Sequence, residues 1–527
     1  MKKIEKDLMS FIDKTPNAYY CVNNIKKILK KNGYQELKEN ESWDIVARGG
    51  KFYVIRNDSS IIAFNGGRLD TQEDRFNIVA VHGDSPSFKI KKNPDMYDGV
   101  YLKLNTGSYG GMINYTWFDR PLSIAGRVVS RNYGHLTKSL INIDKDLLVI
   151  PSQAVHVNRG VNESASFNRQ TDMLPIMALT DKKDLDSIIR EDLKKQNIDF
   201  TKIYDYDLYL YNRDKAKQIG ANNEMILAPR LDDLACVYPA LQALIDSENE
   251  NVINVLSVFN NEEIGSLTEQ GADSSFLNDV LSRIAYERNF YLGTALAKSF
   301  MISADNAHAT HPNAEFKSDP TNKVKLNKGV VIKNHINYTT DALSSAVFKV
   351  ICDDAGVPYQ DFECRSDMPC GSTLGGISTS HVSIDSVDIG LPQLAMHSAN
   401  ETIGTKDIMH MYNSLLEFYN SKIEKDNNKI RILKRWWKRK MNLEKEIKEI
   451  KERNKRVEKD KAWETSLTRR ICIMVLTYVV VIIYSYVIRK TDSIFLSSLV
   501  PVIGFTLSTL SLGIIRRIWD NKKSKNV

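Results

Sequence analysis

Two neighbouring glutamates, Glu262 and Glu263, follow a hydrophobic run in the stretch NVINVLSVFNNEEIGS. Adjacent like charges repel each other, so such a pair is most easily explained by a positive charge that lies between or beside them. Carboxylates and histidines also occur in four other stretches: VHGDSP, PRLDDL, SADNAHATHPN and MHSANE. Imidazole nitrogens and carboxylate oxygens are the ligands of zinc sites that keep open positions for substrate. The five stretches together predict a zinc site, although each one alone is weak evidence.

These stretches supply a defined set of candidate residues. His82 and Asp84 are two positions apart, so in an extended chain their side chains point to the same face. The carboxylate can then hydrogen-bond the second nitrogen of the imidazole and fix its orientation. The remaining candidates are Asp232, Asp233, Glu262, Glu263, Asp305, His308, His311, His397 and Glu401.

The elements that must position these residues alternate between strands and helices. NIVAVHGDSP, NVINVLSVFNNEEIGS and PQLAMHSANE are typical of strands that run into loops or turns, whereas RLDDLACVYPALQALI is typical of the beginning of a helix. This alternation predicts an α/β sheet, in which ligands bind beyond the carboxyl ends of the strands. Between about residue 95 and residue 220 the chain is instead rich in Gly, Tyr, Thr and Val. We expect a meander of β strands there, inserted into the α/β domain.

Composition and charge divide the chain into two unlike parts. Its 527 residues, 42% hydrophobic and 26% charged, suffice for two or three folded domains and argue against disorder over most of the length. Residues 421–527 carry 26 Lys and Arg against 11 Asp and Glu, a net charge of +15, which leaves −8 for residues 1–420. The six cysteines are scattered without a CxxC pair, so reduced thiols in a cytosolic setting are expected.

Two long apolar runs lie in the basic part of the chain. Ile471–Ile488 and Ile494–Ile515 contain no charged residue, and they span roughly 27 and 33 Å as helices, which fits a hydrocarbon core of about 30 Å. A transmembrane hairpin is therefore expected across residues 471–515, with membrane lipid as a partner. Basic residues flank both outer ends, so the positive-inside rule places these ends and the body in the cytoplasm. The N-terminus lacks the apolar core of a secretory signal.

A charged stretch, residues 421–470, separates the body from these runs and is expected to be a helical linker. Its basic cluster around Trp436 and Trp437 favours an anionic membrane surface, and no nucleic-acid partner is expected because no nucleic-acid motif accompanies the cluster. The expected organisation is a catalytic domain in two parts, 1–95 and 223–420, an inserted β-rich domain at 96–222, the linker at 421–470, two membrane helices at 471–515 and a basic tail at 516–527.

Eight stretches, in order along the body, resemble one family. They are AVHGDSPSFKIK, TWFDRPLSIAGRV, IPSQAVHVNRGVN, PRLDDL, NNEEIGS, SADNAHATHPN, RSDMPCGSTLGG and LPQLAMHS. Together they resemble the M18 metalloaminopeptidases, the aspartyl aminopeptidase family, from about Phe11 to about Glu417. The resemblance implies a zinc-peptidase sheet flanked by helices, with the inserted β-rich domain mediating dimers. It also implies an aminopeptidase that removes N-terminal residues from peptides, with acidic residues favoured, and a homo-oligomer built from dimers, up to a tetrahedral dodecamer.

The resemblance further implies two Zn²⁺ ions per subunit, with other divalent metals as alternatives. Asp232 is implied to bridge the two ions. His82 and Asp305 are implied to complete the ligands of one ion, and Glu263 and His397 those of the other. Each assignment agrees with the chemistry, since a carboxylate has two oxygens and can be shared by two cations.

Three residues are implied to act beside the metals: Glu262 as general base on a metal-bridging water, Asp84 as the residue that orients the His82 imidazole, and His156 as a donor to a neighbouring subunit's active site. Lys333 and Tyr338 match positions that face substrate in the family. A lysine there could pair with an acidic side chain, and a solvated lysine is the alternative.

Other candidates receive structural roles or leave alternatives open. His308 and His311 are expected to hold loops or subunit contacts, and Cys370 to lie in a glycine-containing turn near the site. Asp233 stands where Asn is common in the family, which leaves the side-chain preference open. Two alternatives to the aminopeptidase are a catalytically silent, membrane-anchored scaffold of the same fold and a related dizinc deacylase or carboxypeptidase, which should lack the inserted-domain motifs.

Overall fold

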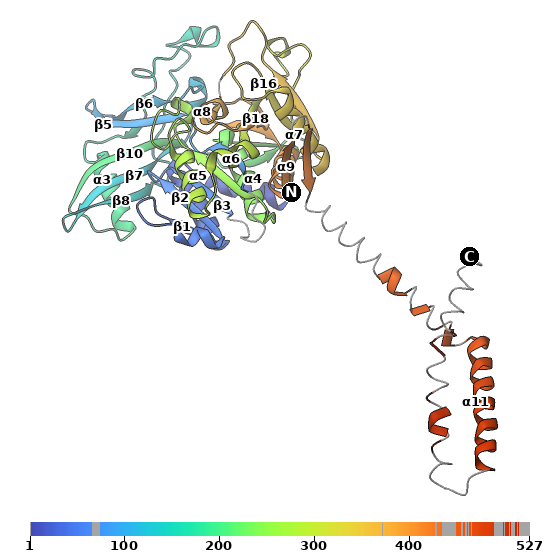
Figure 1. Cartoon of the computed structure of the whole chain (residues 1–527). Helices are drawn as coiled ribbons and strands as arrows, with labels where there is room; N and C mark the ends of the chain where they lie inside the picture. Colours follow the sequence, from blue (N-terminus) through green and yellow to red (C-terminus); the bar gives the residue numbers. More distant parts are fainter. Residues whose placement is uncertain are drawn as a thin grey trace. The chain divides into compact units, whose positions relative to one another are not determined.

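The structure is a computed structural model (Figure 1), and it describes residues 2–65, 74–371, 373–426, 429–434 and parts of 450–515, the longest of which is 466–489. The chain divides into two compact units, Met1–Arg435 and Trp436–Val527. The first unit holds all the candidate site residues.

A nine-stranded mixed sheet forms the centre of the first unit, in the order β1-β2-β3-β13-β4-β14-β18-β16-β17. The neighbours β13, β4, β14 and β18 run parallel, and every side chain of β4 and β13 is buried, as expected where both faces of a sheet are covered. The strands are β1 (Gln35–Leu37), β2 (Lys51–Arg56), β3 (Ser60–Asn65), β4 (Phe76–His82), β13 (Ile253–Phe259), β14 (Phe300–Ala304), β16 (Val330–Asn334), β17 (Tyr359–Glu363) and β18 (Asp385–Gly390).

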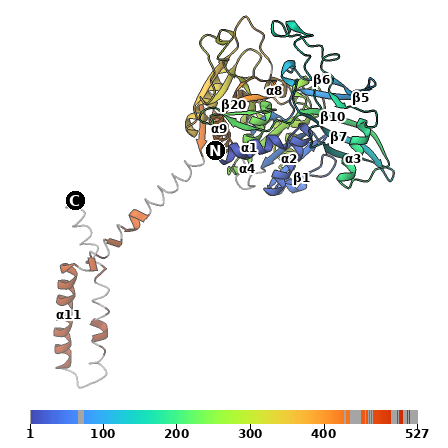
Figure 2. The same ribbon diagram turned by 180° about the vertical axis from the view of Figure 1, so that it is seen from behind.

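Helices cover both faces of this sheet. Val79 and Val81 of β4 pack into one core, with α1, α2, α4, α7 and α9, while Ile78 and Ala80 pack into another, with α5, α6 and α8, because successive side chains of a strand point to opposite faces. Figure 1 shows α5 and α6 on the near side, and Figure 2 shows α1 and α2 from behind. The helices are α1 (Lys3–Asp13), α2 (Ala18–Lys31), α4 (Leu231–Asp246), α5 (Phe276–Glu287), α6 (Leu292–Lys298), α7 (Ala342–Ala355), α8 (Leu374–His381) and α9 (Thr405–Asn420).

A six-stranded antiparallel sheet lies between β4 and α4 in sequence, in the order β8-β7-β10-β5-β6-β9, and shares a core of its own with α3 (Leu185–Lys195). Most of this sheet lies in the stretch expected to be rich in strands, but its first strand begins at Ser87, before the expected boundary at residue 96. The segment after His82 therefore leads directly into this sheet. The strands are β5 (Ser87–Tyr97), β6 (Leu102–Tyr109), β7 (Leu122–Asn132), β8 (His135–Asn142), β9 (Ile176–Ala178) and β10 (Lys202–Asn212).

A small third sheet, in the order β11-β12-β20-β19-β15, holds together segments that are distant in sequence. Its strands are β11 (Lys217–Ile219), β12 (Met225–Ala228), β15 (Ala307–His308), β19 (Pro392–Leu394) and β20 (Glu401–Gly404). Short 3-10 helices complete the unit: η1 (Asp44–Arg48), η3 (Asn114–Trp117), η4 (Arg159–Asn162), η5 (Glu262–Ile264) and η6 (Glu315–Lys317). The sheet brings the beginning of α4 close to the loop between β19 and β20.

Residues 421–426 and 429–434 pair as a β hairpin, which differs from the helical linker expected from residue 421. β21 (Ser421–Asp426) pairs antiparallel with β22 (Lys429–Lys434), Ile423 is buried, and the Asn77 amide donates to the carbonyl of Ser421. In KIRILK, Ile430 and Ile432 lie two positions apart, and this spacing favours a strand over a helix. The first unit therefore continues through this hairpin.

In the second unit the longest described element is α11 (Leu467–Ile488). Its segment Leu467–Tyr486 is long and apolar enough to cross a membrane by length and composition, and it is not buried within the structure. Most of the second expected span, residues 494–515, and the basic tail at 516–527 lie outside the described residues, as does most of the linker from residue 435.

Candidate metal centre

Three of the candidate segments meet at the carboxyl ends of parallel strands. His82 is the last residue of β4, and Asp305 directly follows β14, the neighbour of β4 on one side. Glu262 and Glu263 lie in η5, just beyond β13, the neighbour of β4 on the other side. Because the carboxyl ends of neighbouring parallel strands share one edge of the sheet, a strand-end histidine and three carboxylates converge there.

Glu401 holds the other two ligand-type residues in place. Asp232 is at the beginning of α4, and His397 lies between β19 and β20 with a φ of 66°, a left-handed conformation that is uncommon for histidine. The buried Glu401 carboxylate accepts the backbone N–H of His397 at 2.6 Å and that of Asp232 at 3.0 Å. One side chain, whose role the sequence pattern does not reveal, therefore joins the two segments.

The two carboxylate oxygens of Asp232 face different histidines. Oδ1 lies 3.4 Å from Nε2 of His82, and Oδ2 lies 3.4 Å from Nε2 of His397. Asp305 stands on the first side, with Oδ1 3.7 Å from His82 Nε2, and Glu263 on the second, with Oε2 3.5 Å from His397 Nε2. Two adjacent groups of potential metal ligands therefore share Asp232: one also holds His82, Asp233 and Asp305, and the other Glu263 and His397. A further group joins His82 to Glu262 and Glu263.

Buried oxygen atoms in these groups lack hydrogen-bond partners. Asp232 Oδ1 and Glu263 Oε1 are both buried and accept no hydrogen bond from the described residues. A buried carboxylate oxygen without a partner is costly, and a bound cation removes that cost. The donor set of imidazole nitrogens and carboxylate oxygens fits zinc.

Asp84 fixes both the His82 ring and the turn that carries the glutamates. The Asp84 backbone carbonyl lies 3.1 Å from His82 Nδ1, and Oδ1 lies 3.4 Å from the same nitrogen. The Asp84 carboxylate also accepts the backbone N–H groups of Glu262 at 3.3 Å and of Glu263 at 3.2 Å. The Tyr109 hydroxyl, from β6 of the second sheet, donates to Asp84 Oδ2 at 2.7 Å. Tyr109 was missed at the sequence level, because a tyrosine before two glycines carries no signal for such a contact.

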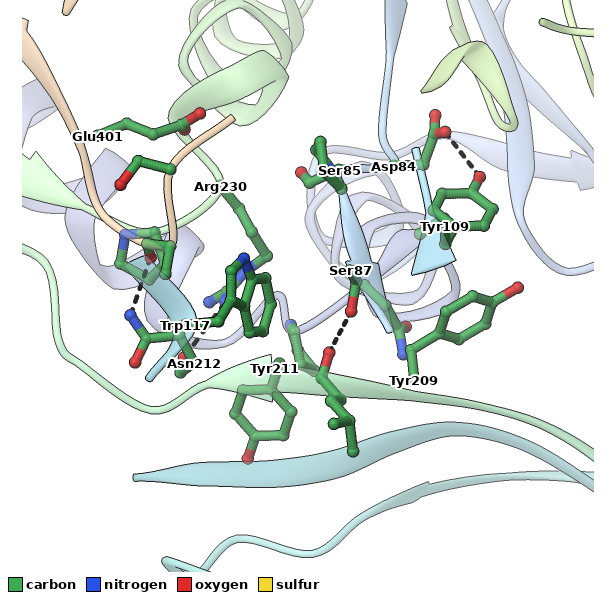
Figure 3. A pocket seen from close by; sticks show the side chains of 18 of the residues that line it. Asp84, Ser85, Ser87, Tyr109, Trp117, Tyr209, Tyr211, Asn212, Arg230 and Glu401 are labelled. Atoms are coloured by element: carbon green, nitrogen blue, oxygen red, sulfur yellow. Dashed lines mark hydrogen bonds between the residues drawn. The ribbon is translucent and has the colours of Figure 1, made fainter. Parts of the chain in front are cut away.

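A pocket lies beside Asp84, where side chains of the central and second sheets meet. Figure 3 shows Tyr109 directed at Asp84, with Tyr209 next to it and Arg230 farther along the pocket. Glu401, which holds the segments of the metal centre, lines the same pocket. Polar side chains therefore join the second sheet directly to the surroundings of the candidate centre.

Burial and neighbouring charges shift the pKa values of the centre in opposite directions. Burial raises the pKa of Glu262 to about 7, although the nearby His82 opposes this shift. Burial also disfavours the ionised form of Asp232, but His397 and His82 outweigh it and hold the pKa of Asp232 below its ordinary range. Asp232 is therefore ionised between two histidines, while Glu262 keeps the proton affinity that a proton-transfer group needs.

The other predicted site residues lie in different surroundings. Lys333 is only 4% exposed, and its ammonium nitrogen lies 3.1 Å from Asp305 Oδ2, so its charge is already paired inside the protein. Tyr338 is half-buried, with its ring centroid 5.9 Å from that nitrogen. His156 is exposed in a loop and does not belong to the ligand-type clusters that the described residues form. His311 Nδ1 accepts the backbone N–H of Asn313, so it stabilises its own loop.

Scattered cysteines predict reduced thiols, but Cys364 and Cys370 are joined by a disulfide. Their Cα atoms lie 6.0 Å apart, within the range that a disulfide can span. Five residues separate the two cysteines, so no CxxC pattern reveals the pairing. The described cysteines that remain free are Cys21, Cys236, Cys352 and Cys472.

Residues 11–419 match a family model described as aminopeptidase I zinc metalloprotease (M18). A probable M18 family aminopeptidase 2 of Clostridium novyi (strain NT) is 47% identical over 422 residues, which cover 78% of this chain and 96% of that protein. A chain in the solved Ape4 and Nbr1 complex is 34% identical with a TM-score of 0.75, over 79% of this chain and 85% of that one. The S. cerevisiae mApe1 dodecamer is 26% identical with a TM-score of 0.69, over 79% of this chain and 96% of that one.

Proposed function

The chain belongs to the M18 family of zinc aminopeptidases, and from this premise we propose that it removes single N-terminal residues from peptides with two zinc ions per subunit. The observation that carries the two-ion proposal is the position of Asp232, which turns one carboxylate oxygen toward His82 and the other toward His397. A single metal would leave one of these two groups of ligand-type side chains without a cation.

The proposed ligands follow from the two groups. His82 and Asp305 would hold one ion, Glu263 and His397 the other, and Asp232 both. When bound, the ions supply Lewis acidity that polarises the scissile carbonyl and lowers the pKa of water. Each proposed ion would have one histidine and one carboxylate of its own, in addition to the shared Asp232, and this equal composition supports the assignment.

Glu262 is proposed as the general base. It accepts a proton from the attacking water and delivers it to the leaving amine, a task that suits a half-buried carboxyl whose pKa lies near neutrality. Asp84 supports separate roles for the two glutamates, because its carboxylate accepts the backbone N–H groups of both and so fixes the turn that carries them. Glu263 can then bind metal while Glu262 remains free to transfer protons.

Acidic N-terminal residues are the substrate class that we propose to test first, on the basis of the sequence resemblance to the aspartyl aminopeptidases. We further propose a homo-oligomer built from dimers, because the similar mApe1 of S. cerevisiae forms a dodecamer. The second sheet would form the dimer contact, and the exposed His156 would reach the active site of a neighbouring subunit.

A membrane attachment through residues 471–515 is proposed from α11, whose apolar segment is exposed in the structure. The basic residues on both outer ends favour a cytoplasmic location for the catalytic unit. Recovery of the full-length protein in the soluble fraction after high-speed centrifugation without detergent would rule out this attachment.

The function is tested by substitution of Glu262 in the full-length protein. Glu262→Gln should retain the zinc content of wild type, measured by mass spectrometry, and lower kcat roughly 10²–10⁴-fold on short peptides. Glu269→Gln is the matched control, since Glu269 is exposed and lies outside the centre. Near wild-type turnover by Glu262→Gln would refute the base assignment, and a zinc-loaded wild type that releases no amino acid would favour the silent scaffold.

A further inference from the structure

A second cluster of metal-ligating side chains lies outside the proposed centre. A ring nitrogen of His335 and the sulfur atoms of Cys364 and Cys370 all lie within 4.8 Å of one another. His335 directly follows β16 and Cys364 directly follows β17, and these two strands are parallel neighbours whose carboxyl ends coincide. Cys370 comes from the loop before α8. The fold thus brings together two thiols and an imidazole that belong to three different segments.

We propose that His335, Cys364 and Cys370 form a further metal site, for a thiophilic divalent cation such as zinc, that is open only when the two cysteines are reduced. Thiolate sulfur and imidazole nitrogen form one of the ligand sets that zinc prefers. All three residues are half-buried, so a cation can reach them from solvent. The disulfide seen in the structure is the closed state of the same site.

The exchange between the two states is balanced by ordinary thiol chemistry. Two equivalents of a thiol reductant break the sulfur–sulfur bond through a mixed disulfide, giving two cysteine thiols and the oxidised disulfide of the reductant, with a transfer of two electrons. Binding of the divalent cation then releases the two thiol protons. A small disulfide such as oxidised glutathione reverses the exchange and expels the cation.

The cluster is also close to the side chains that contact the proposed zinc ligands. The Tyr338 hydroxyl lies 3.2 Å from Cys370 Sγ, and the Tyr338 ring faces Lys333, which pairs with Asp305.

Asp388 also connects the loops that carry Tyr338 and Cys370. It accepts a hydrogen bond from the Thr339 backbone at 2.7 Å and from the Thr373 hydroxyl at 2.7 Å, so the two loops are held by one side chain. A change of state at the cysteines is therefore next to the wall of the proposed active site.

Cadmium is a suitable probe, because its bonds to thiolates give an ultraviolet charge-transfer absorption and the proposed zinc ligands contain no sulfur. Full-length protein is reduced, freed of reductant without air and titrated with Cd²⁺. We expect a saturable charge-transfer absorption at about one equivalent per subunit. The same protein treated with oxidised glutathione should show none. Absence of the absorption from reduced wild type would overturn the proposal, whether or not the chain is a peptidase.

Variants separate this site from other thiols. Cys364→Ser should abolish the absorption, and His335→Ala should weaken Cd²⁺ binding at least about tenfold, because one of three ligands is lost. Cys352→Ser is the matched control, since Cys352 is a buried free cysteine outside the cluster, and it should titrate like wild type. Thermal unfolding of each variant checks the fold. Unchanged absorption in both Cys364→Ser and His335→Ala would contradict the assignment.

Discussion

The ammonium nitrogen of Lys333 lies 3.1 Å from Oδ2 of Asp305, so a buried positive charge holds one oxygen of a proposed zinc ligand. Lys333→Met keeps most of the side-chain volume and leaves this oxygen unpaired, at a cost of about 1–3 kcal/mol or more. We expect a lower free energy of unfolding in denaturant titrations and faster loss of zinc on dialysis against a chelator.

Lys349→Met is the control for this prediction. Lys349 pairs with Asp361 at 2.9 Å, but both side chains are about one-third exposed, so loss of this ion pair should cost less than about 1 kcal/mol. Lys333→Met could instead leave stability and zinc retention unchanged and raise only the KM for acidic peptides. This result would show that the charge of Lys333 binds substrate and does not stabilise Asp305.

Tyr109→Phe removes one donor to the Asp84 carboxylate and keeps the aromatic ring. A hydrogen bond to a charged group contributes about 1.5–3 kcal/mol. If about 1.4 kcal/mol of this appears in the activation free energy, because Asp84 is held less firmly, kcat/KM should fall roughly tenfold while zinc content is retained. Tyr97→Phe is the control, because Tyr97 is 46% exposed and its hydroxyl only contacts the carbonyl of Gly99. Equal activity of the two variants would show that Tyr109 does not support the site.

His156 can be tested by mixing inactive subunits. His156→Ala and Glu262→Gln should each be inactive alone if His156 serves a neighbouring active site. In mixed oligomers, a Glu262→Gln subunit can lend its intact His156 to a His156→Ala subunit that keeps Glu262. We expect activity to return after the two variants are dissociated together and reassembled. No recovery, with mixed oligomers demonstrated by differential tagging, would exclude the exchange.

The pKa of Glu262 predicts a pH dependence. In the protein alone, burial raises this pKa to about 7. Two cations beside Glu262 would favour its ionised form and lower the pKa. Since a general base must be unprotonated, kcat/KM should rise with pH through this pKa, and its acidic limb should have a midpoint below 7 in the zinc-loaded enzyme. Measurement of kcat/KM from pH 4 to 8 checks this, and a midpoint above 7 would contradict it.

The α/β fold and the ligand-type side chains could be predicted because their signals are local. A run of buried strand residues precedes His82, Glu262, Glu263 and Asp305. These side chains converge because neighbouring parallel strands end at the same edge of the sheet. The sequence also places Asp232 at the beginning of a helix, but no local rule sets Asp232 opposite His397. That pairing depends on Glu401 and on the small third sheet.

The missed features depend on contacts between distant segments. Tyr109 reaches Asp84 from another sheet, and Lys333 pairs with Asp305 instead of facing solvent, so neither partner can be read from sequence spacing. The hairpin of β21 and β22 is hard to predict because its many charges resemble those of the linker that follows. Ile430 and Ile432, two positions apart, are the available signal.

The proposed ligands are spread from His82 to His397, and this spacing has a consequence during synthesis of the chain. Ribosomes add roughly 5–20 residues per second and N-terminal parts fold first, so no partial chain that stops before His397 contains the complete ligand set. The apolar helix α11 begins about 70 residues later, which corresponds to a delay of roughly 4–14 s. A nascent chain would thus become a competent hydrolase only late in translation, shortly before its apolar helix is made.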